Sequence, residues 1–227
     1  MGSSMFRAAA WTWFIAAWVT IFGNSATVQA AEVTKQDYPE TIAVLQLLHT
    51  SEIRAGHRYK VYANVAADEG YANIAHMLTA MAASEDLHAF HFERILTSLG
   101  VEASGADMGE IELSGTKENL KYATEVELTE IDKDYPRYLK RIAAEHHAEA
   151  VEFITYAWQA EKQHRALIKE IRSGTGIFFS KLLDYFRTNP SRYYVNQICG
   201  STVTRLPEDV CPICHNPVDT YLEIPKP

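Results

Sequence analysis

The chain has 227 residues, of which 47% are hydrophobic and 22% are charged, and its formal net charge at pH 7 is -8. This composition is that of a folded globular protein and excludes an intrinsically disordered chain. The acidic balance, with no basic cluster, also argues against nucleic acid as a partner.

The first thirty residues differ from the rest and predict a secretory leader. Arg7 is their only charged residue, the apolar run 8–23 follows it, and the segment closes on the small-residue sequence Val28-Gln29-Ala30. An uncleaved membrane anchor is the alternative, but the run is shorter than the roughly 20 residues that span a bilayer. We therefore expect residues 1–30 to be a signal peptide cleaved after Ala30, with export to the bacterial periplasm and no membrane association afterwards. Loss of Arg7 changes the net charge from -8 to -9.

Two long helices are predicted after the leader. Asp37 is placed to cap the first one, Pro39 falls in its first turn, and apolar residues recur at helical spacing to about residue 67, where Glu69-Gly70 ends the pattern. The second helix runs from about residue 72 to 99 and stops at Gly100. Together they form a helical hairpin.

A second hairpin follows a long connection. Residues 100–115 hold four glycines in a weakly apolar stretch. The third helix starts near Thr116, and Pro136 falls inside its pattern, where it should kink or break it; the fourth runs from about residue 148 to 172. Two helical hairpins joined by one crossover predict an all-α fold built on a four-helix bundle.

The end of the chain has a different composition. From about residue 191 it holds five of the eight prolines and all three cysteines. We therefore expect a bundle domain at 31–175, a linker at 176–190 and a small second domain at 191–227.

A repeated motif on these helices predicts a metal centre. Each hairpin carries Glu-x-x-His on its second helix, and one Glu on its first helix precedes that motif by 33 or 34 residues. Residues at i and i+3 share a helix face, and this combination builds carboxylate-bridged two-metal centres in bundle cores. The set is Glu52, Glu85, His88, Glu127, Glu161 and His164.

Electrostatics requires a cation if these groups converge. Burying several carboxylates costs several kcal/mol each, and two divalent cations would compensate the charge. Imidazole ligands favour iron, manganese or zinc over calcium. Surface ion pairs are the simpler explanation of one Glu-x-x-His, but a matched repeat within two hairpins makes coincidence a poor account.

Further residues around the motif resemble the rubrerythrin family. They are Arg58-Tyr59 and Glu69-Gly70-Tyr71 in the first hairpin, Asn119-Leu120-Lys121, residues 125–130 and Tyr135-Pro136 in the third helix, and residues 160–164 in the fourth. The resemblance covers about residues 40–172 and the tail. It implies a ferritin-like di-iron bundle followed by a small rubredoxin-like metal-ribbon domain.

The resemblance also implies a seventh ligand, Glu130. In the family, one iron moves between this carboxylate and a histidine, so Glu130 and His88 would be alternative ligands of an iron that Glu52 also binds. Glu127 and His164 would then bind the second iron, and Glu85 and Glu161 would bridge the two irons.

Two tyrosines, Tyr59 and Tyr135, match those whose hydroxyl groups bond the ligand carboxylates in the family. Such contacts orient metal ligands. Ordinary aromatic packing in the core is the alternative for both residues.

The resemblance implies an enzyme, a homodimeric oxidoreductase that reduces hydrogen peroxide to water. Two adjacent ferrous ions can each give one electron to the O–O bond. Two rival functions use the same ligands: an oxygen-dependent ferroxidase and a non-catalytic metal-binding bundle.

The tail departs from the family pattern. Cys211-Pro212-Ile213-Cys214 matches the second cysteine pair of a rubredoxin-like iron site, but in the first pair Asn196 stands where a cysteine should precede Cys199. Either the three cysteines bind iron or zinc, with a fourth ligand from Asn196, His215, water or a partner chain, or Cys211 and Cys214 form a disulfide and Cys199 stays free. The altered site puts the internal electron relay in doubt, so we expect an external electron-donor protein.

Overall fold

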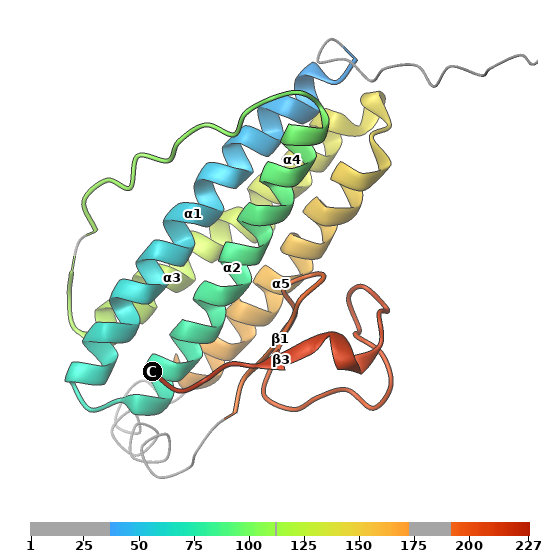
Figure 1. Cartoon of the computed structure of the whole chain (residues 1–227). Helices are drawn as coiled ribbons and strands as arrows, with labels where there is room; N and C mark the ends of the chain where they lie inside the picture. The colour runs from blue at the N-terminus through green and yellow to red at the C-terminus, as the bar shows by residue number, and fades with distance from the viewer. Residues whose placement is uncertain (1–36, 112, 173–191) are drawn as a thin grey trace, which may run out of the picture. The chain divides into compact units, whose positions relative to one another are not determined.

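The computed structural model describes residues 37–111, 113–172 and 192–227. The predicted signal peptide and linker lie outside these residues, so both stay predictions. In the described part, long helices lie side by side in a bundle and a small sheet follows them in the chain (Figure 1). None of the helices in that part is long and apolar enough to cross a membrane.

The first hairpin consists of α1 (Pro39–Asp68) and α2 (Ala72–Ser98), close to the predicted limits. Its capping differs from the prediction, because Tyr38, not Asp37, occupies the N-cap of α1 and makes no side-chain cap bond. The free backbone N–H groups of Glu40 and Thr41 instead donate to the carboxylate of Glu145, at 2.8 and 2.7 Å. A carboxylate distant in sequence therefore satisfies the start of α1.

The third predicted helix is interrupted, as the proline indicated. It consists of α3 (Thr116–Thr129), the π-helical turn η1 (Glu130–Asp134) and α4 (Tyr135–Ile142). Pro136 lies in the first turn of α4, where the absence of an N–H breaks no helical hydrogen bond. In the interior of one regular helix, the same proline would have removed a hydrogen bond. A short 3-10 turn η2 (Ala143–Glu145) leads to α5 (Ala148–Arg172), the last helix of the bundle.

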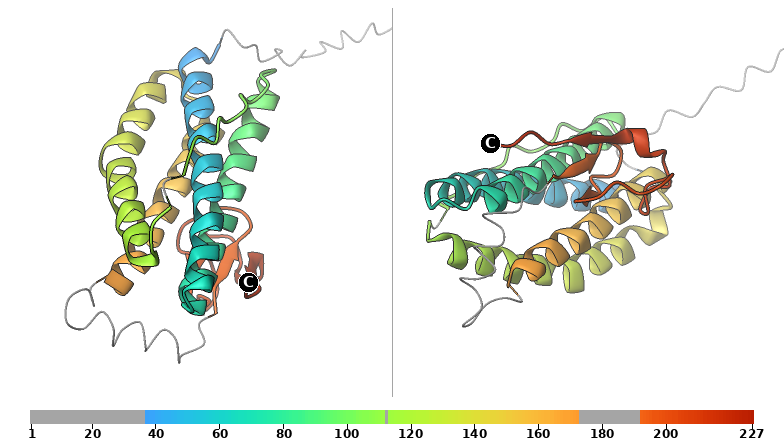
Figure 2. Two further views of the ribbon diagram at one scale, coloured as in Figure 1. Left: turned by 90° about the vertical axis from the view of Figure 1, so that its left-hand side faces the viewer. Right: turned by 90° about the horizontal axis from the view of Figure 1, so that it is seen from below.

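The connection between the hairpins is extended and runs along α1 (Figure 2). Hydrogen bonds from α1 hold it there: Gln46 Nε2 donates to the carbonyl of Glu102 and Arg54 Nε to that of Asp107, both at 2.7 Å. The crossover is therefore fixed to the bundle by side chains.

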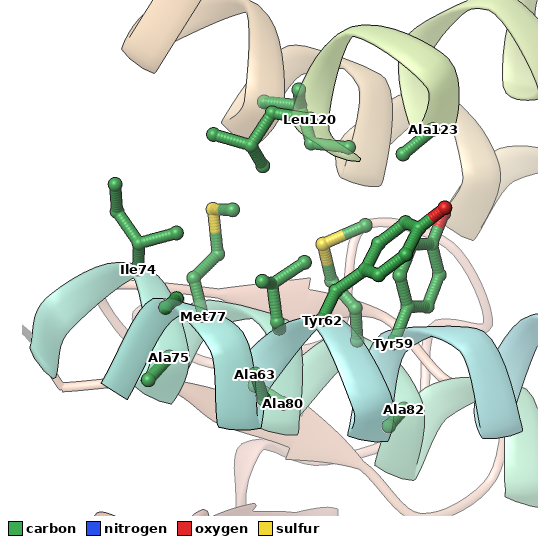
Figure 3. Close-up of a cluster of buried hydrophobic side chains, with 14 of the residues drawn as sticks. Tyr59, Tyr62, Ala63, Ile74, Ala75, Met77, Ala80, Ala82, Leu120 and Ala123 are labelled. Atoms are coloured by element: carbon green, nitrogen blue, oxygen red, sulfur yellow. The ribbon is translucent and has the colours of Figure 1, made fainter. Parts of the chain in front are cut away.

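Two apolar clusters fill the bundle, and α1, α2 and α5 each contribute side chains to both. One cluster joins α1 and α2 to Leu120 and Ala123 of α3 (Figure 3). The other contains Leu48 and Phe92. Along α1, Glu52 falls between Leu48 and Ala55, which belong to different clusters. The polar centre thus lies between two apolar layers.

The tail forms a three-stranded antiparallel sheet in the order β2-β1-β3, from β1 (Tyr194–Asn196), β2 (Thr202–Val203) and β3 (Tyr221–Glu223), with a 3-10 turn η3 (Val218–Thr220) before β3. It contacts α2 and α5. His76 Nε2 of α2, for example, bonds the carbonyl of Ile224 at 2.7 Å. The predicted all-α bundle with a small metal-ribbon tail is confirmed.

Candidate metal centre

The bundle brings together five of the seven predicted ligands among the described side chains. Ligand atoms of Glu52 from α1, Glu85 and His88 from α2 and Glu161 from α5 all lie within 4.8 Å of one another. His164 of α5 joins them, because its Nδ1 lies 3.1 Å from Glu85 Oε1 and 3.5 Å from Glu161 Oε2. Every one of these side chains is buried.

The convergent charges perturb one another. Burial, together with repulsion from Glu85, raises the pKa of Glu161 above its usual range and that of Glu52 well above it. Burial also opposes ionisation of Glu85, but the two imidazoles outweigh it and lower the pKa of Glu85. His164 loses solvation too, yet Glu85 and Glu161 raise its pKa well above the usual range. The group is a strained set of charges that cations would relieve.

Hydrogen bonds that both histidines donate to the tail determine how their rings face this centre. His88 Nε2 lies 3.2 Å from the carbonyl oxygen of Cys199, which can only accept, so Nε2–H donates. Thr202 Oγ1 donates its single hydrogen to the carbonyl of Gly200 at 3.0 Å, so it must accept from His164 Nε2 at 3.2 Å. When the imidazoles are neutral, as metal binding requires, the Nδ1 lone pair of each therefore points toward the carboxylates.

This arrangement fits metal ions. The lone pair of His88 Nδ1 faces Glu85 Oε2 at 3.1 Å, and two acceptors stay that close only with a proton or a cation between them. Glu85 Oε1 and His164 Nδ1 are buried and lie 3.1 Å apart, yet neither makes a well-aligned hydrogen bond to another described residue. Buried polar atoms without partners are rare, and metal coordination would account for both.

Glu130, the predicted seventh ligand, lies to one side. It begins the π-helical turn and accepts a hydrogen bond from Ser51 Oγ at 3.1 Å. Burial and the neighbouring Glu161 raise the pKa of Glu130 to about 8. The structure thus holds His88 in the cluster and Glu130 outside it, one of the two arrangements that the family resemblance implies. The alternation itself stays a prediction.

A small cavity lies beside Glu130 and α1. Its volume is about 30 Å³, room for about one water molecule. Its lining consists of Leu47, Leu48, Ser51, Glu52, Glu130, Asp134, Tyr135 and Tyr138. Leu47 is half exposed, so this cavity lies close to the molecular surface.

The remaining predicted residues have different positions. Tyr135 is buried and its hydroxyl donates to Glu52 Oε1 at 2.7 Å, in the ligand-orienting position expected for it. Tyr59 lies among the apolar side chains of Figure 3, so its predicted role is untested. Glu127 belongs to α3, but its side chain lies outside the described part of the structure.

Sequence reasoning missed the contacts that hold the π-helical turn. Trp158 Nε1 of α5 donates to the carbonyl of Ile131 at 2.9 Å, and Lys162 Nζ lies 3.6 Å above the Trp158 ring. A π-turn leaves carbonyl groups that need partners. The only available signal was that Trp158 is the sole tryptophan after residue 18.

The tail holds a second cluster. The Sγ atoms of Cys199, Cys211 and Cys214 lie within 4.8 Å of one another, and all three residues are free, buried thiols. The alternative disulfide between Cys211 and Cys214 is not formed. His215 is exposed and is not among the converging donors, which removes it from the alternatives for the fourth ligand.

Comparison with known proteins agrees with this geometry. Residues 44–171 match the model of a family described as Rubrerythrin. The chain belongs to the rubrerythrin family. Rubrerythrin-2 of Clostridium acetobutylicum is 29% identical over 177 residues, which cover 77% of this chain and 91% of that protein. Nigerythrin of Nitratidesulfovibrio vulgaris is 22% identical over 198 residues, which cover 87% and 93%.

Solved structures share the fold. The fully reduced, all-ferrous state of nigerythrin superposes with a TM-score of 0.69 at 22% identity, over 92% of this chain and 99% of that one. A bacterioferritin from Desulfovibrio desulfuricans superposes with a TM-score of 0.64 at 19% identity, over 68% and 91%. The predicted family is confirmed, and the chain is a rubrerythrin-family di-iron protein of the oxidoreductase class.

Proposed function

We propose that this protein is a peroxidase that reduces hydrogen peroxide to water at the bundle centre, using electrons from an external donor protein. The reaction takes one peroxide, two electrons and two protons to two waters. When bound, two ferrous ions supply the two electrons that break the O–O bond.

The observation that carries the proposal is the closure of the centre. The tail covers both histidines, and the cavity beside Glu52 and Glu130 has a volume of only about 30 Å³. A molecule of the size of hydrogen peroxide fits that space, whereas a hydrated ferrous ion does not. This supports resident metals that meet a small oxidant over a ferroxidase that takes up iron as substrate.

The side chains around the centre bind and orient. Tyr135 fixes Glu52, and Ser51 holds Glu130 beside the cavity. The tail fixes His88 and His164 in the tautomer that binds metal. Rigid ligands reduce the reorganisation that accompanies electron transfer to the oxidant.

The tail is also placed to admit electrons. The backbone carbonyl of Cys199 accepts a hydrogen bond from His88, a predicted iron ligand. The path from the Cys199 sulfur to that ligand therefore consists of the covalent bonds within Cys199 and one hydrogen bond. We infer that a donor protein docks near the tail, and that the protein acts in the periplasm as a homodimer after cleavage behind Ala30. Mass measurement of the secreted chain and light scattering test the last two points.

Stopped-flow oxidation tests the activity. The full chain, loaded anaerobically with two ferrous ions, is mixed with hydrogen peroxide, oxygen or tert-butyl hydroperoxide. We expect hydrogen peroxide to oxidise it at least about tenfold faster than either alternative. Faster oxidation by oxygen would favour the ferroxidase, and equal rates with the bulky peroxide would contradict the role of the cavity. Failure to retain two irons would reject both enzymes.

A further inference from the structure

We propose that Asn196 completes a second metal site, in which one tetrahedral cation is bound by the thiolates of Cys199, Cys211 and Cys214 and by the carboxamide oxygen of Asn196. The site would take a divalent ion that accepts sulfur ligands, such as zinc or ferrous iron. The inference rests on the geometry of the tail and is independent of the peroxidase proposal.

The distances within the cysteine cluster, and from it to Asn196, are compatible with a tetrahedral site. With metal–sulfur distances of about 2.3 Å, the edges of a four-sulfur tetrahedron are about 3.8 Å long. Cys199 Sγ lies 3.5 Å from Cys211 Sγ, and Asn196 Oδ1 lies 3.7 Å from Cys214 Sγ. The two remaining sulfur–sulfur distances are no longer than 4.8 Å. One ion between the three sulfurs would therefore have Asn196 Oδ1 close to its fourth position, beside Cys214.

Asn196 occupies a position equivalent to that of a cysteine. The segments Asn196-Gln-Ile-Cys199 and Cys211-Pro-Ile-Cys214 have the same spacing. In the second, the backbone N–H of Ile213 points at Cys211 Sγ, at 3.4 Å. In the first, the N–H of Ile198 donates to Asn196 Oδ1 at 2.9 Å. In both turns, the N–H of the third residue thus points at the side-chain acceptor of the first residue. That acceptor is a sulfur in Cys211 and an oxygen in Asn196.

The orientation of the Asn196 amide follows from its partners. Its side chain is fully buried, and Nδ2 donates to Thr220 Oγ1 at 2.6 Å. Oδ1 accepts from the N–H of Cys199 at 3.2 Å as well as from Ile198. Because both backbone groups are donors, the oxygen and not the nitrogen must face the sulfurs.

The chemistry of this donor set differs from that of four thiolates. A neutral carboxamide oxygen replaces one anionic sulfur, so a bound divalent ion carries one less unit of negative charge around it. Tyr221 further withdraws charge by donating its hydroxyl hydrogen to Cys211 Sγ at 3.1 Å. Net charge and hydrogen bonds to sulfur set the potential of iron–thiolate sites, so iron bound here would have a higher reduction potential than with four cysteines.

Cobalt(II) binding to the full chain tests the proposal, because thiolate-to-cobalt absorption reports on the tail and is absent from carboxylate sites. We expect the wild-type protein to show these bands at one equivalent per chain and to protect its three thiols from a thiol reagent. Asn196→Ala should weaken cobalt binding to the tail at least tenfold, Asn196→Asp should retain it, and Asn196→Cys should strengthen it and shift the bands to those of four thiolates.

Two results would overturn the proposal. One is a wild-type protein without thiolate bands while Asn196→Cys shows them, because the native set then binds no metal. The other is an Asn196→Ala variant with the affinity and spectrum of the wild type, because Asn196 then is not a ligand. Circular dichroism and the metal content of the bundle centre identify a variant that has merely misfolded.

Discussion

The bundle centre and the cysteine cluster of the tail position their donors by opposite means. In the bundle, the oxygen and nitrogen ligands come from three long helices and are spread over the sequence from Glu52 to His164. The negative charges of the carboxylates repel one another. In the tail, sulfur and amide donors come from two short turns within residues 196–214, and backbone N–H groups stabilise them. Helix packing thus forces unfavourable charges together, whereas the turns satisfy their donors locally.

Gly200 lies where the two regions meet. Gly200 adopts φ +74°, and a Cβ there would lie 2.2 Å from His88 Nε2 and 2.6 Å from Ser84 Oγ. Its carbonyl accepts from Ser84 Oγ at 2.7 Å. The close approach of tail and bundle therefore depends on the absence of a side chain at this position.

The largest effect should come from Glu52→Gln, which separates metal binding from stability. The variant keeps the shape and an acceptor for Tyr135 but removes a carboxyl whose ionisation burial and Glu85 oppose, so the metal-free protein should gain about 1–3 kcal/mol near neutral pH. It should lose most of its bundle iron while the tail retains its thiolate–metal bands. Urea unfolding and iron analysis measure both effects, and a less stable metal-free variant would contradict the view that the centre is electrostatically strained.

Gly200→Ala should separate the two regions. The added methyl clashes with His88 and the positive φ is unfavourable for alanine, so we expect a loss of about 1–3 kcal/mol and slower electron transfer from tail to bundle. Gly100→Ala is the matched control, since Gly100 also has a positive φ of +70° but nothing lies within 4 Å of a Cβ there. Calorimetry and single-turnover reduction measure the effects; equal behaviour of the two variants would show that the tail does not need this contact.

Thr202→Val tests how the tail orients a bundle ligand. The substitution keeps the shape but removes the acceptor of His164 Nε2–H, and loss of such a partner lowers metal affinity about 10–100-fold. Thr202→Ser, which retains the hydroxyl, should behave like the wild type. Iron competition with a chelator gives the affinities, and an unchanged affinity in Thr202→Val would mean that helix packing alone orients His164.

A smaller effect is expected from pH. Burial raises the pKa of Glu130 to about 8, so its contribution to the stability of the metal-free protein is present below the ordinary carboxylate pKa and is lost as pH rises toward 8. Glu52, Glu161 and His164 have raised pKa values and act in the same direction, while Glu85 acts in the opposite one. The urea concentration at the unfolding midpoint should therefore decrease as the pH is raised from 5 to 8. Glu130→Gln should flatten the slope, and an unchanged slope would argue against burial of Glu130.

Much of the fold followed from local patterns. The Glu-x-x-His pairs predicted two ligands on one helix face because i and i+3 residues are neighbours on any α-helix. The interruption at Pro136 followed from its missing N–H, although the form of that interruption, a π-helical turn, depends also on Trp158 of another helix. The cap of α1 could not be predicted, because Glu145 lies about a hundred residues away from the N–H groups that it satisfies.

The sequence by itself determined the identities and local spacing of the donors: Glu85 with His88, Glu161 with His164, and Cys211 with Cys214. These depend only on helix and turn geometry, which neighbouring residues set. The tertiary structure alone decided that the Cys199 carbonyl and Thr202 fix the tautomers of both histidines, that Glu130 rests on Ser51, and that Asn196 Oδ1 faces the cysteine sulfurs. Such contacts join segments distant in the chain, and only the packing of tail against bundle brings their atoms within bonding distance.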